Sequence, residues 1–589
     1  ESNNDKEPFV FHDGPPYANG SIHVGHLLNK VLKDFVVRSQ QMLGHNSSYI
    51  PGWDCHGLPI EWKIEEQYRE KGKDKDEVDI IQFRKECREF AKKWIDIQRT
   101  EFIRLGVTGD WFNPYTTMSY EAESTIVKEF FKFLENESLY RGSKPVMWST
   151  VEKTALAEAE IEYKEHKSIT IFVKFPVISS LENNEVNTSV IIWTTTPWTI
   201  PANRAIAFSK DISYSIYSVN GLEENSLLKE GEQIIIADEL IDNVRTQCKV
   251  KELTKIRAIK DLDQIICGHP FRDSGYDFEV KLFDADFVTL EQGSGFVHIA
   301  PGHGADDYNL GIANNVEVPE TVDENGQYFD HVPLFKGKKV FNDDGSDADA
   351  NVAVIVELKN HNNLAGKGSL RHSYPHSWRS KAPVIFRNTP QWFISMEKNG
   401  LRSTALNEID KVNWFPKQGK NRIYSMIEDR PDWVVSRQRA WGVPLSIFYH
   451  IETGQPLMDK EINQKIIDLY REEGSDAWFK YSKEELLGDK YDPNDYKKVD
   501  DILDVWFDSG CTHSFVLDEK EDQIWPASLY LEGTDQHRGW LHSSLLESCG
   551  TRGIAPYESV LTHGFVLHED GLKMSKSSAN IVSPDEIIN

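Results

Sequence analysis

A short apolar segment, a glycine- and proline-rich loop and an amphipathic helix follow one another at the start of the chain. This order restricts the fold more than any other feature. Residues 8–11, Pro-Phe-Val-Phe, predict a short buried strand, and residues 13–20 form the loop. Apolar residues then recur at helical spacing before Gly44, a plausible helix end: Val24, Leu27, Leu28, Val31 and Phe35. A strand, a tight turn and a helix N-terminus in this order predict the first unit of a doubly wound parallel nucleotide-binding sheet.

The character of the sequence changes twice along its length. A helical stretch is predicted to continue to about residue 165, and β-branched runs alternate with turn residues from 168 to about 288. Mixed strand and helix patterns return from about residue 430. We therefore predict an α/β fold in which a doubly wound parallel sheet is interrupted by a β-rich domain.

Composition limits the possible classes of protein. A chain of 589 residues exceeds one hydrophobic core and suggests three or four domains. No apolar run reaches the length of a membrane-spanning helix, so no membrane partner is expected. None of the six cysteines has C-x-x-C spacing, so no zinc ribbon, other metal site or disulfide framework is predicted. The net charge of −28 means that any surface that binds nucleic acid is local or lies outside this chain.

Two short motifs near the ends of the chain point to phosphate chemistry. His23-Val24-Gly25-His26 opens the first predicted helix, and its two imidazoles could donate hydrogen bonds to the same phosphates. Gly25 would let a nucleotide approach the backbone. Lys573-Met574-Ser575-Lys576-Ser577 suits a mobile loop that neutralises developing phosphate charge. Each motif alone is also compatible with structural histidines or with a solvated basic loop.

Together, about 550 residues apart, the two motifs resemble the signatures of class I aminoacyl-tRNA synthetases. The resemblance implies attack of an amino-acid carboxylate on the α-phosphate of ATP, followed by transfer of the aminoacyl group to tRNA. It makes His23, His26, Lys573 and Lys576 the catalytic residues and places Gly25 and Ser575 at the ATP. Mg²⁺ would accompany ATP as a phosphate counter-ion. No tightly bound metal is implied, and a monomer is the family expectation.

Three segments indicate isoleucine as the amino acid. Residues 52–61, GWDCHGLPIE, resemble the isoleucine members, and Asp54 is a natural partner for the substrate ammonium. Arg439 in residues 436–444 disfavours valine members, although leucine members can share it. The third segment, residues 532–540, would contact the adenylate through Glu532, Gly533, Asp535 and Gln536. Gln536 would also contact isoleucine, with Pro15, Trp506 and Trp540 as apolar walls, although tryptophans are also common in simple core packing.

A pocket sized for isoleucine rejects valine by only about 1–3 kcal/mol, a case that is the standard example of this limit. A second, hydrolytic site is therefore expected in the β-rich segment, where residues 193–203 and 293–308 resemble editing motifs. Thr194, Thr195, Thr196 and Asn203 would position water and the terminal adenosine. His298 would border the pocket, and Asp307 would hold the ammonium of the mischarged residue. A threonine cluster alone could equally be a strand.

These readings predict four parts of the chain. They are the N-terminal half of the catalytic domain with connecting helices (1–165), the editing domain (166–370), a return connection (371–430) and the C-terminal half of the catalytic domain (431–589). The chain ends 13 residues beyond Lys576, without the helical anticodon-binding region of the family. We therefore expect adenylate formation with weak tRNA charging by these residues alone.

The predicted partners are tRNA(Ile), isoleucine and ATP. Residues 371–380 resemble bacterial and organellar enzymes, and asparagine-rich segments favour the mitochondrial matrix over the bacterial cytoplasm. A valine or leucine synthetase, a small nucleotidyltransferase and an inactive RNA-binding paralogue are the alternatives. The β-rich motifs argue against the second, and the two intact phosphate motifs argue against the third.

Overall fold

The computed structural model describes residues 6–179, 187–520, 523–567, 582–584 and 586. These residues form two compact units. The first unit comprises residues 1–142, 157–159 and 391–589, and the second comprises residues 143–156 and 160–390. Each unit has its own clusters of buried apolar side chains, so each is described separately.

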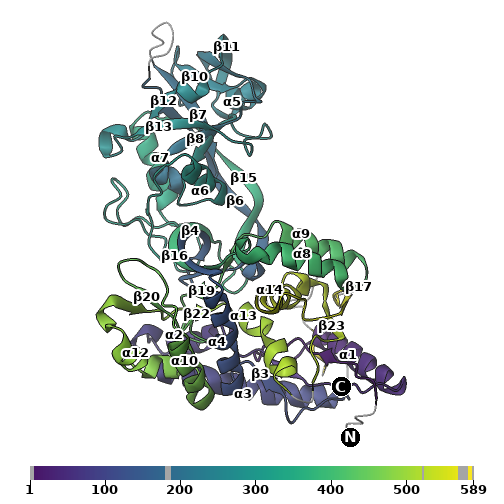
Figure 1. Ribbon diagram of the computed structural model, residues 1–589. Helices are drawn as coiled ribbons and strands as arrows, with labels where there is room; N and C mark the ends of the chain where they lie inside the picture. Colours follow the sequence, from purple (N-terminus) through teal and green to yellow (C-terminus); the bar gives the residue numbers. More distant parts are fainter. Residues whose placement is uncertain (1–5, 180–186, 521–522, 568–581, 585, 587–589) are drawn as a thin grey trace. The chain divides into compact units, whose positions relative to one another are not determined.

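A four-stranded parallel sheet forms the centre of the first unit. Its order is β1 (Phe11–His12), β23 (Leu529–Gly533), β24 (Ser559–His563) and β17 (Asn413–Phe415). All three pairings are parallel, and Phe11 pairs with Leu529. Segments from the two ends of the chain, purple and yellow in Figure 1, are therefore neighbours in one sheet. The predicted parallel sheet, started at the N-terminus and completed after an interruption, is confirmed.

Helix α1 (Val24–Met42) follows β1 and contacts β23. His23 caps its N-terminus. Of the apolar residues predicted at helical spacing, Val24 is buried and Leu27, Leu28 and Val31 are partly buried, but Phe35 is 62% exposed, so the predicted stripe only partly matches the buried face. Gly44, with φ of +101°, lies just past its end, where a left-handed residue is common. Helix α14 (Trp540–Arg552) connects β23 to β24 and completes a β-α-β unit.

The other helices of the first unit surround this sheet and its connections. They are α2 (Leu58–Glu70), α3 (Ile80–Arg104), α4 (Tyr120–Glu135), α8 (Leu401–Lys411), α9 (Gln418–Glu428), α10 (Lys460–Glu473), α11 (Ala477–Lys480), α12 (Lys483–Leu487), α13 (Val505–Gly510) and a π-helical turn, Ser514–Asp518. Short strand pairs join β2 (Gly52–Trp53) to β3 (Tyr115–Thr116), β19 (Ser436–Arg437) to β22 (Ile502–Leu503), and β20 (Phe448–His450) to β21 (Tyr496–Lys498). Strand β18 (Trp433–Val434) pairs with residues 393–394 of β16 (Ile385–Ile394).

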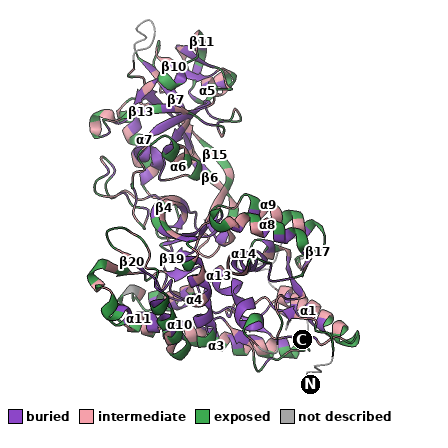
Figure 2. Ribbon diagram, viewed as in Figure 1, coloured by how far each residue is buried: buried purple, intermediate pink, exposed green. Residues whose placement is uncertain are grey.

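The second unit is built around a ten-stranded mixed sheet. Its strands are β6 (Ile161–Pro176), β7 (Thr188–Thr194), β8 (Ala205–Phe208), β9 (Tyr214–Leu222), β10 (Gln233–Ala237), β11 (Val250–Ile259), β12 (Ile266–Gly268), β13 (Glu279–Asp284), β14 (Val297–Ile299) and β15 (Leu364–Ser377). Helices α5 (Ile241–Gln247), α6 (Ala305–Ala313) and α7 (Ala350–Asn360) complete it. Figure 2 shows that β7 and β10 are largely buried, as expected for the middle of a sheet. The predicted β-rich interruption is confirmed.

The expectation of helix up to residue 165 was wrong. Strand β4 (Leu139–Ser149) pairs with β5 (Thr154–Ala155), and β6 already begins at Ile161. The first half of β6 pairs antiparallel with β15, which lies about 200 residues later in the sequence. A partner so distant in sequence overrides the local helix preference of the lysines and glutamates in this stretch.

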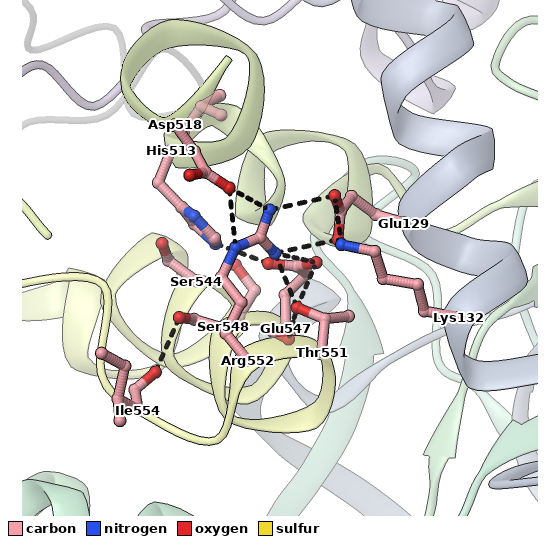
Figure 3. A network of polar contacts seen from close by, with 12 residues as sticks. Glu129, Lys132, His513, Asp518, Ser544, Glu547, Ser548, Thr551, Arg552 and Ile554 are labelled. Carbon is pink, nitrogen blue, oxygen red and sulfur yellow. Dashed lines mark hydrogen bonds and ion pairs between the residues drawn. The ribbon is translucent and has the colours of Figure 1, made fainter. Parts of the chain in front are cut away.

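A buried network of ions joins α4, α14 and the π-helical turn of the first unit (Figure 3). The Arg552 guanidinium lies 2.9 Å from Glu129 of α4 and 2.9 Å from Asp518. His513 forms a 2.5 Å hydrogen bond with Glu547 one helical turn before Arg552. The network therefore holds the C-terminal end of α14 against two neighbouring elements.

Within the described parts of the chain, no helix has both the length and the apolar character needed to cross a membrane. All six cysteines are buried as free thiols. The structure also describes no group of three or more His, Cys, Asp or Glu side chains placed to hold a metal ion.

Candidate functional sites

A pocket of about 400 Å³ opens at the carboxyl ends of β1, β23 and β24 in the first unit. This is where ligands bind to open parallel sheets, because strand ends and helix N-termini converge there. The pocket brings together residues predicted from four separate segments: Pro15, His23, Gly25, His26, Asp54, Trp506, Glu532, Gly533, Asp535, Gln536 and Trp540. Lys573, Ser575 and Lys576 lie outside the described residues.

The two histidines share a capping arrangement at the start of α1. His23 Nδ1 accepts a hydrogen bond from Gly25 N (3.0 Å), and His26 Nδ1 accepts one from His23 N (3.2 Å). Their ring centroids are 4.0 Å apart. Because each Nδ1 is an acceptor, each Nε2 carries a proton and is a donor. The pair thus places two imidazole rings beside a helix N-terminus, where an anion is favoured.

Gly25 is required by this arrangement itself. A Cβ at position 25 would come within 2.7 Å of His23 Cε1. Any larger residue would therefore push the His23 ring out of its capping position. Gly25 also lines the pocket, which agrees with the predicted close approach of a nucleotide.

Asp54 is a buried carboxylate that faces the pocket. The loop 14–18 holds it in place, because Asp54 N donates to Pro16 O and Ala18 N donates to Asp54 O, both at 2.9 Å. Thr117 Oγ1 donates to its Oδ1 at 3.2 Å. Burial, and then the charge of Asp508, raise the pKa of Asp54 to about 8. Among the residues described, no lysine or arginine forms an ion pair with Asp54, so a cationic ligand would stabilise its charge.

Glu532 belongs to a buried ionic network below the pocket. Its Oε1 lies 2.6 Å from Lys33 Nζ, and Asp13 accepts from Lys30 (2.5 Å) and Lys33 (2.6 Å). Glu532 also accepts from Gly14 N (3.1 Å) and Asn29 Nδ2 (3.1 Å). These contacts tie the loop after β1 to the end of β23, so Glu532 fixes the shape of the pocket.

The apolar wall of the pocket depends on how Trp540 is held. Its ring stacks on Tyr530 with centroids 4.1 Å apart and planes at 7°, and Nε1 donates to Ser509 O at 2.9 Å. Gln536 Oε1 accepts from Trp540 N (3.0 Å), which places Gln536 beside the first turn of α14. Pro15 and Trp506 line the same pocket. The predicted wall residues are therefore together.

A second pocket, of about 440 Å³, lies within the second unit at the end of β7. It contains Thr194, Thr195, Thr196, His298 and Asp307, although these come from segments about 100 residues apart. Asn203 is buried behind His298 and does not line the pocket. Asn203 therefore contacts His298 and does not face the pocket itself.

A chain of hydrogen bonds connects the threonines to His298. Thr196 Oγ1 lies 3.2 Å from both Thr194 Oγ1 and Thr199 Oγ1, and Thr199 Oγ1 lies 2.9 Å from His298 Nε2. Asn203 Nδ2 donates to His298 Nδ1 at 3.3 Å. Burial, and then His303, lower the pKa of His298 to about 3, so the ring is neutral. With Nδ1 accepting, Nε2 donates to Thr199 and aligns the hydroxyls.

Asp307 lies in the first turn of α6 and faces this second pocket. Its Oδ2 accepts from Ala300 N at 2.8 Å. Burial raises the pKa of Asp307 to about 7. As for Asp54, the described residues form no ion pair with this carboxylate, and a cationic group would favour its charged form.

Several residues at the two sites were missed from the sequence. In the first pocket they are Asn29, Lys30 and His563, with Asp13 and Lys33 below it. In the second they are Thr199 behind the wall and Glu291, Gln292 and His303 along it. Lys30 and Lys33 are buried in α1, but they lie on the side of the helix opposite to the apolar residues Leu28 and Val31, so the apolar spacing did not signal their burial.

Comparison with known proteins gives three findings. Residues 1–589 match the family described as tRNA synthetases class I (I, L, M and V). Isoleucine--tRNA ligases of Pelagibacter ubique and Caulobacter vibrioides are 56% and 54% identical over 100% and 98% of this chain, but the matches cover only 64% and 61% of those proteins. The chain therefore spans less than two thirds of these relatives. A LeuRS of Agrobacterium radiobacter K84, solved with tRNA and LeuAMS, aligns with a TM-score of 0.45 and 15% identity, over 100% of this chain and 67% of that one.

Proposed function

Because this chain belongs to the class I tRNA synthetases of the isoleucine, leucine, methionine and valine group, we propose that it activates isoleucine with ATP for transfer to tRNA(Ile). The observation that carries the proposal is the pocket at the sheet edge, which combines a buried carboxyl group with two imidazole donors. The carboxyl group is that of Asp54, which a cationic ligand would ionise, and the donors are His23 and His26. A zwitterionic amino acid and a polyphosphate are the ligands that this combination suits.

In the proposed reaction, the carboxylate of the amino acid attacks the α-phosphate of ATP. A P–O bond forms, the bond to the leaving pyrophosphate breaks, and an aminoacyl-adenylate results. His23 and His26 donate through Nε2 to phosphate oxygens on which negative charge increases. Lys573, Ser575 and Lys576 are proposed to contribute from their loop. Mg²⁺ would arrive with ATP and share the neutralisation of phosphate charge. The substrate supplies the nucleophile, so no covalent enzyme intermediate is required.

The choice of isoleucine is proposed from the wall residues and from the relatives. Pro15, Trp506 and Trp540 offer an apolar surface beside Asp54, so a branched aliphatic side chain would lie against them while its ammonium meets the carboxylate. The two bacterial proteins at 56% and 54% identity are isoleucine--tRNA ligases. We propose Gly533, Asp535 and Gln536 as contacts for the adenosine and the amino acid.

We further propose that the second pocket hydrolyses valine mischarged on tRNA(Ile). Asp307 would bind the α-ammonium, and the hydroxyls of Thr194, Thr195 and Thr196 would position the ester and a water molecule. The neutral His298 would limit the space for the side chain. The first pocket discriminates weakly between isoleucine and valine, which differ by one methylene. The second pocket is therefore proposed to select valine by the size of its side chain.

ATP–pyrophosphate exchange with isoleucine, valine and leucine in parallel tests the activation step. We expect strong exchange with isoleucine, weaker exchange with valine and almost none with leucine. Exchange led by valine or leucine would overturn the amino-acid assignment, and exchange with none of the three would overturn the proposal. Release of valine from preformed Val-tRNA(Ile) tests the second pocket separately. A mitochondrial or bacterial location stays a prediction.

A further inference from the structure

His56, two residues after Asp54 in the 52–61 segment, has no role in the proposed chemistry. His56 is buried between β2 and α2, and its ring contacts Trp441 edge-on at 5.1 Å. His56 Nδ1 lies 2.9 Å from Asp508 Oδ2 of α13, and Nε2 lies 3.3 Å from Glu123 Oε1 of α4. With a carboxylate at each nitrogen, both nitrogens act as donors and the ring carries a positive charge.

The direction of its pKa agrees with this geometry. Burial lowers the pKa of His56, but its hydrogen bonds to Asp508 and Glu123 raise it further, to about 8. Burial alone would produce a neutral ring, as it does at His298. The two carboxylates therefore make His56 a cation at neutral pH.

The charges around His56 are unequal in number. Three buried carboxylates, Asp54, Asp508 and Glu123, face two cations, His56 and Arg88, and Arg88 lies 2.8 Å from Glu123. Asp508 Oδ1 has no hydrogen-bond partner among the described residues. One positive charge is thus missing, and Asp54 is the member of the group that faces the pocket.

The neighbouring charged groups do not supply the missing charge. Asp504, before α13, is paired with Arg437 at 3.0 Å, and Asp476 is paired with Arg84 at 2.5 Å. Burial raises the pKa of the adjacent Cys55 thiol, which is therefore neutral. His56 is the nearest cation that acts on Asp54: it favours the charged form of Asp54, whereas Asp508 opposes it.

We propose that His56 is a positioning residue for amino-acid activation, whose buried positive charge favours the ionised form of Asp54, the form that receives the α-ammonium of the substrate. The ring holds Asp508 and Glu123 together and offsets the negative charge that Asp508 places beside Asp54. The substrate ammonium then supplies the missing cation. This inference rests on the proposed function, because it assigns Asp54 to the ammonium.

The test compares His56→Gln with Asp508→Asn in isoleucine-dependent pyrophosphate exchange by the intact protein, from pH 6 to 9. His56→Gln removes the positive charge. We expect the KM for isoleucine to rise about 10- to 100-fold, the KM for ATP to stay within twofold, and the pH below which the isoleucine KM increases to move upward. Asp508→Asn removes a negative charge but keeps an oxygen for His56 Nδ1. In this variant we expect the pH below which the isoleucine KM increases to move downward.

A purely structural role predicts a different result. If His56 only ties α4 to α13, both substitutions weaken the protein and neither moves the pH dependence of the isoleucine KM. His269→Gln is the matched control, because His269 is another buried histidine with both nitrogens hydrogen-bonded, but in the second unit and to backbone groups. It should leave the isoleucine KM within twofold of wild type.

The outcomes separate the inference from the function. If wild type shows no isoleucine-dependent exchange, the proposed function fails. If wild type is active but His56→Gln leaves the pH dependence in place, the inference is overturned. If His56→Gln does not fold, Glu123→Gln decides the question, because it removes a carboxylate that keeps His56 charged and leaves Asp508 in place. We expect it to move the pH dependence upward, and an unmoved pH dependence would overturn the inference.

Discussion

A carboxylate that is shielded from water and faces a cavity must meet a cation or take up a proton, and two residues of this protein have that position. Asp54 in the first pocket is buried and Asp307 in the second is partly buried, and this shielding raises the pKa of each, to about 8 and about 7. Each is held by backbone groups: an amide donates to Asp307, and backbone bonds fix the main chain of Asp54. Both are therefore pre-organised for an ammonium group.

Asp54→Asn should raise the KM for isoleucine about 100-fold, because a charged hydrogen bond in a buried pocket contributes about 2–3 kcal/mol. The KM for ATP is the internal control and should change by less than twofold. In wild type, the isoleucine KM should fall as pH rises towards 8, since Asp54 with its raised pKa ionises in that range. Asparagine does not titrate, so the isoleucine KM of the variant should not change with pH in this range. An unchanged pH profile of Asp54→Asn would contradict the assignment.

Asp307→Asn should slow the deacylation of Val-tRNA(Ile) at least 100-fold and leave isoleucine-dependent pyrophosphate exchange unaltered. The ionised form of Asp307 predominates only above about pH 7, so deacylation by wild type should decline as pH falls below 7. The neighbouring Asp306 is exposed and does not line the pocket, so Asp306→Asn is the matched control and should stay within twofold. Equal losses in both variants would argue against a specific ammonium site.

Helix α14 shows how one element serves both the pocket and the core. Its first residue, Trp540, forms part of the pocket wall, and Gln536 accepts from the Trp540 amide at its N-terminus. Its last residue, Arg552, is fastened by Glu129 and Asp518 (Figure 3). A shift at the C-terminal end of the helix would therefore move a wall of the pocket.

Arg552→Leu should lower the free energy of unfolding by about 3–5 kcal/mol, because Glu547 would remain buried without its cation and Glu129 would keep only Lys132. Urea unfolding of the first unit measures the change. Lys398→Leu is the control: Lys398 of the same unit is also paired with a glutamate, Glu137, at 2.9 Å, but the two side chains are 48% and 70% exposed. Its loss should cost no more than about 0.5 kcal/mol. Equal losses of stability in the two variants would contradict the proposed contribution of the ion network to the free energy of unfolding.

At the scale of the whole molecule, the two units have separate clusters of buried apolar residues. The main cluster of the first unit includes Ile423 of α9, and a cluster of the second includes Ile236 of β10. No residue belongs to both clusters. The chemistry proposed for each pocket depends on residues of its own unit only.

Calorimetry should therefore resolve two unfolding transitions. Ile236→Ala and Ile423→Ala each remove a fully buried side chain and should each lower the stability of its own transition by about 2–5 kcal/mol. The other transition should stay in place, and pyrophosphate exchange at 25 °C should survive Ile236→Ala. A single transition that both substitutions shift equally would show one cooperative unit instead.

Local patterns in the sequence determined much of this protein. The strand, loop and helix at residues 8–44 and the change to β-branched runs near residue 168 indicated the correct fold class, because apolar periodicity and turn residues act over a few positions. The predicted site residues of the first pocket, except for the loop at 573–577, were named from short motifs and are found together, whereas Asn29, Lys30 and His563 of the same pocket were missed. The four predicted parts of the chain stay a prediction beside the two observed units.

Other features were decided only by the tertiary structure. Strand β6 forms where helix was expected because β15, about 200 residues away, pairs with it. The charges of Lys30, Lys33 and His56 are offset by Asp13, Glu532, Asp508 and Glu123 from distant segments, and no local pattern predicts such partners. Backbone preferences and amphipathic patterns act between near neighbours and can be read from sequence. The pairing of buried charges depends on which distant segments meet, and only the folded chain brings them within a few ångströms.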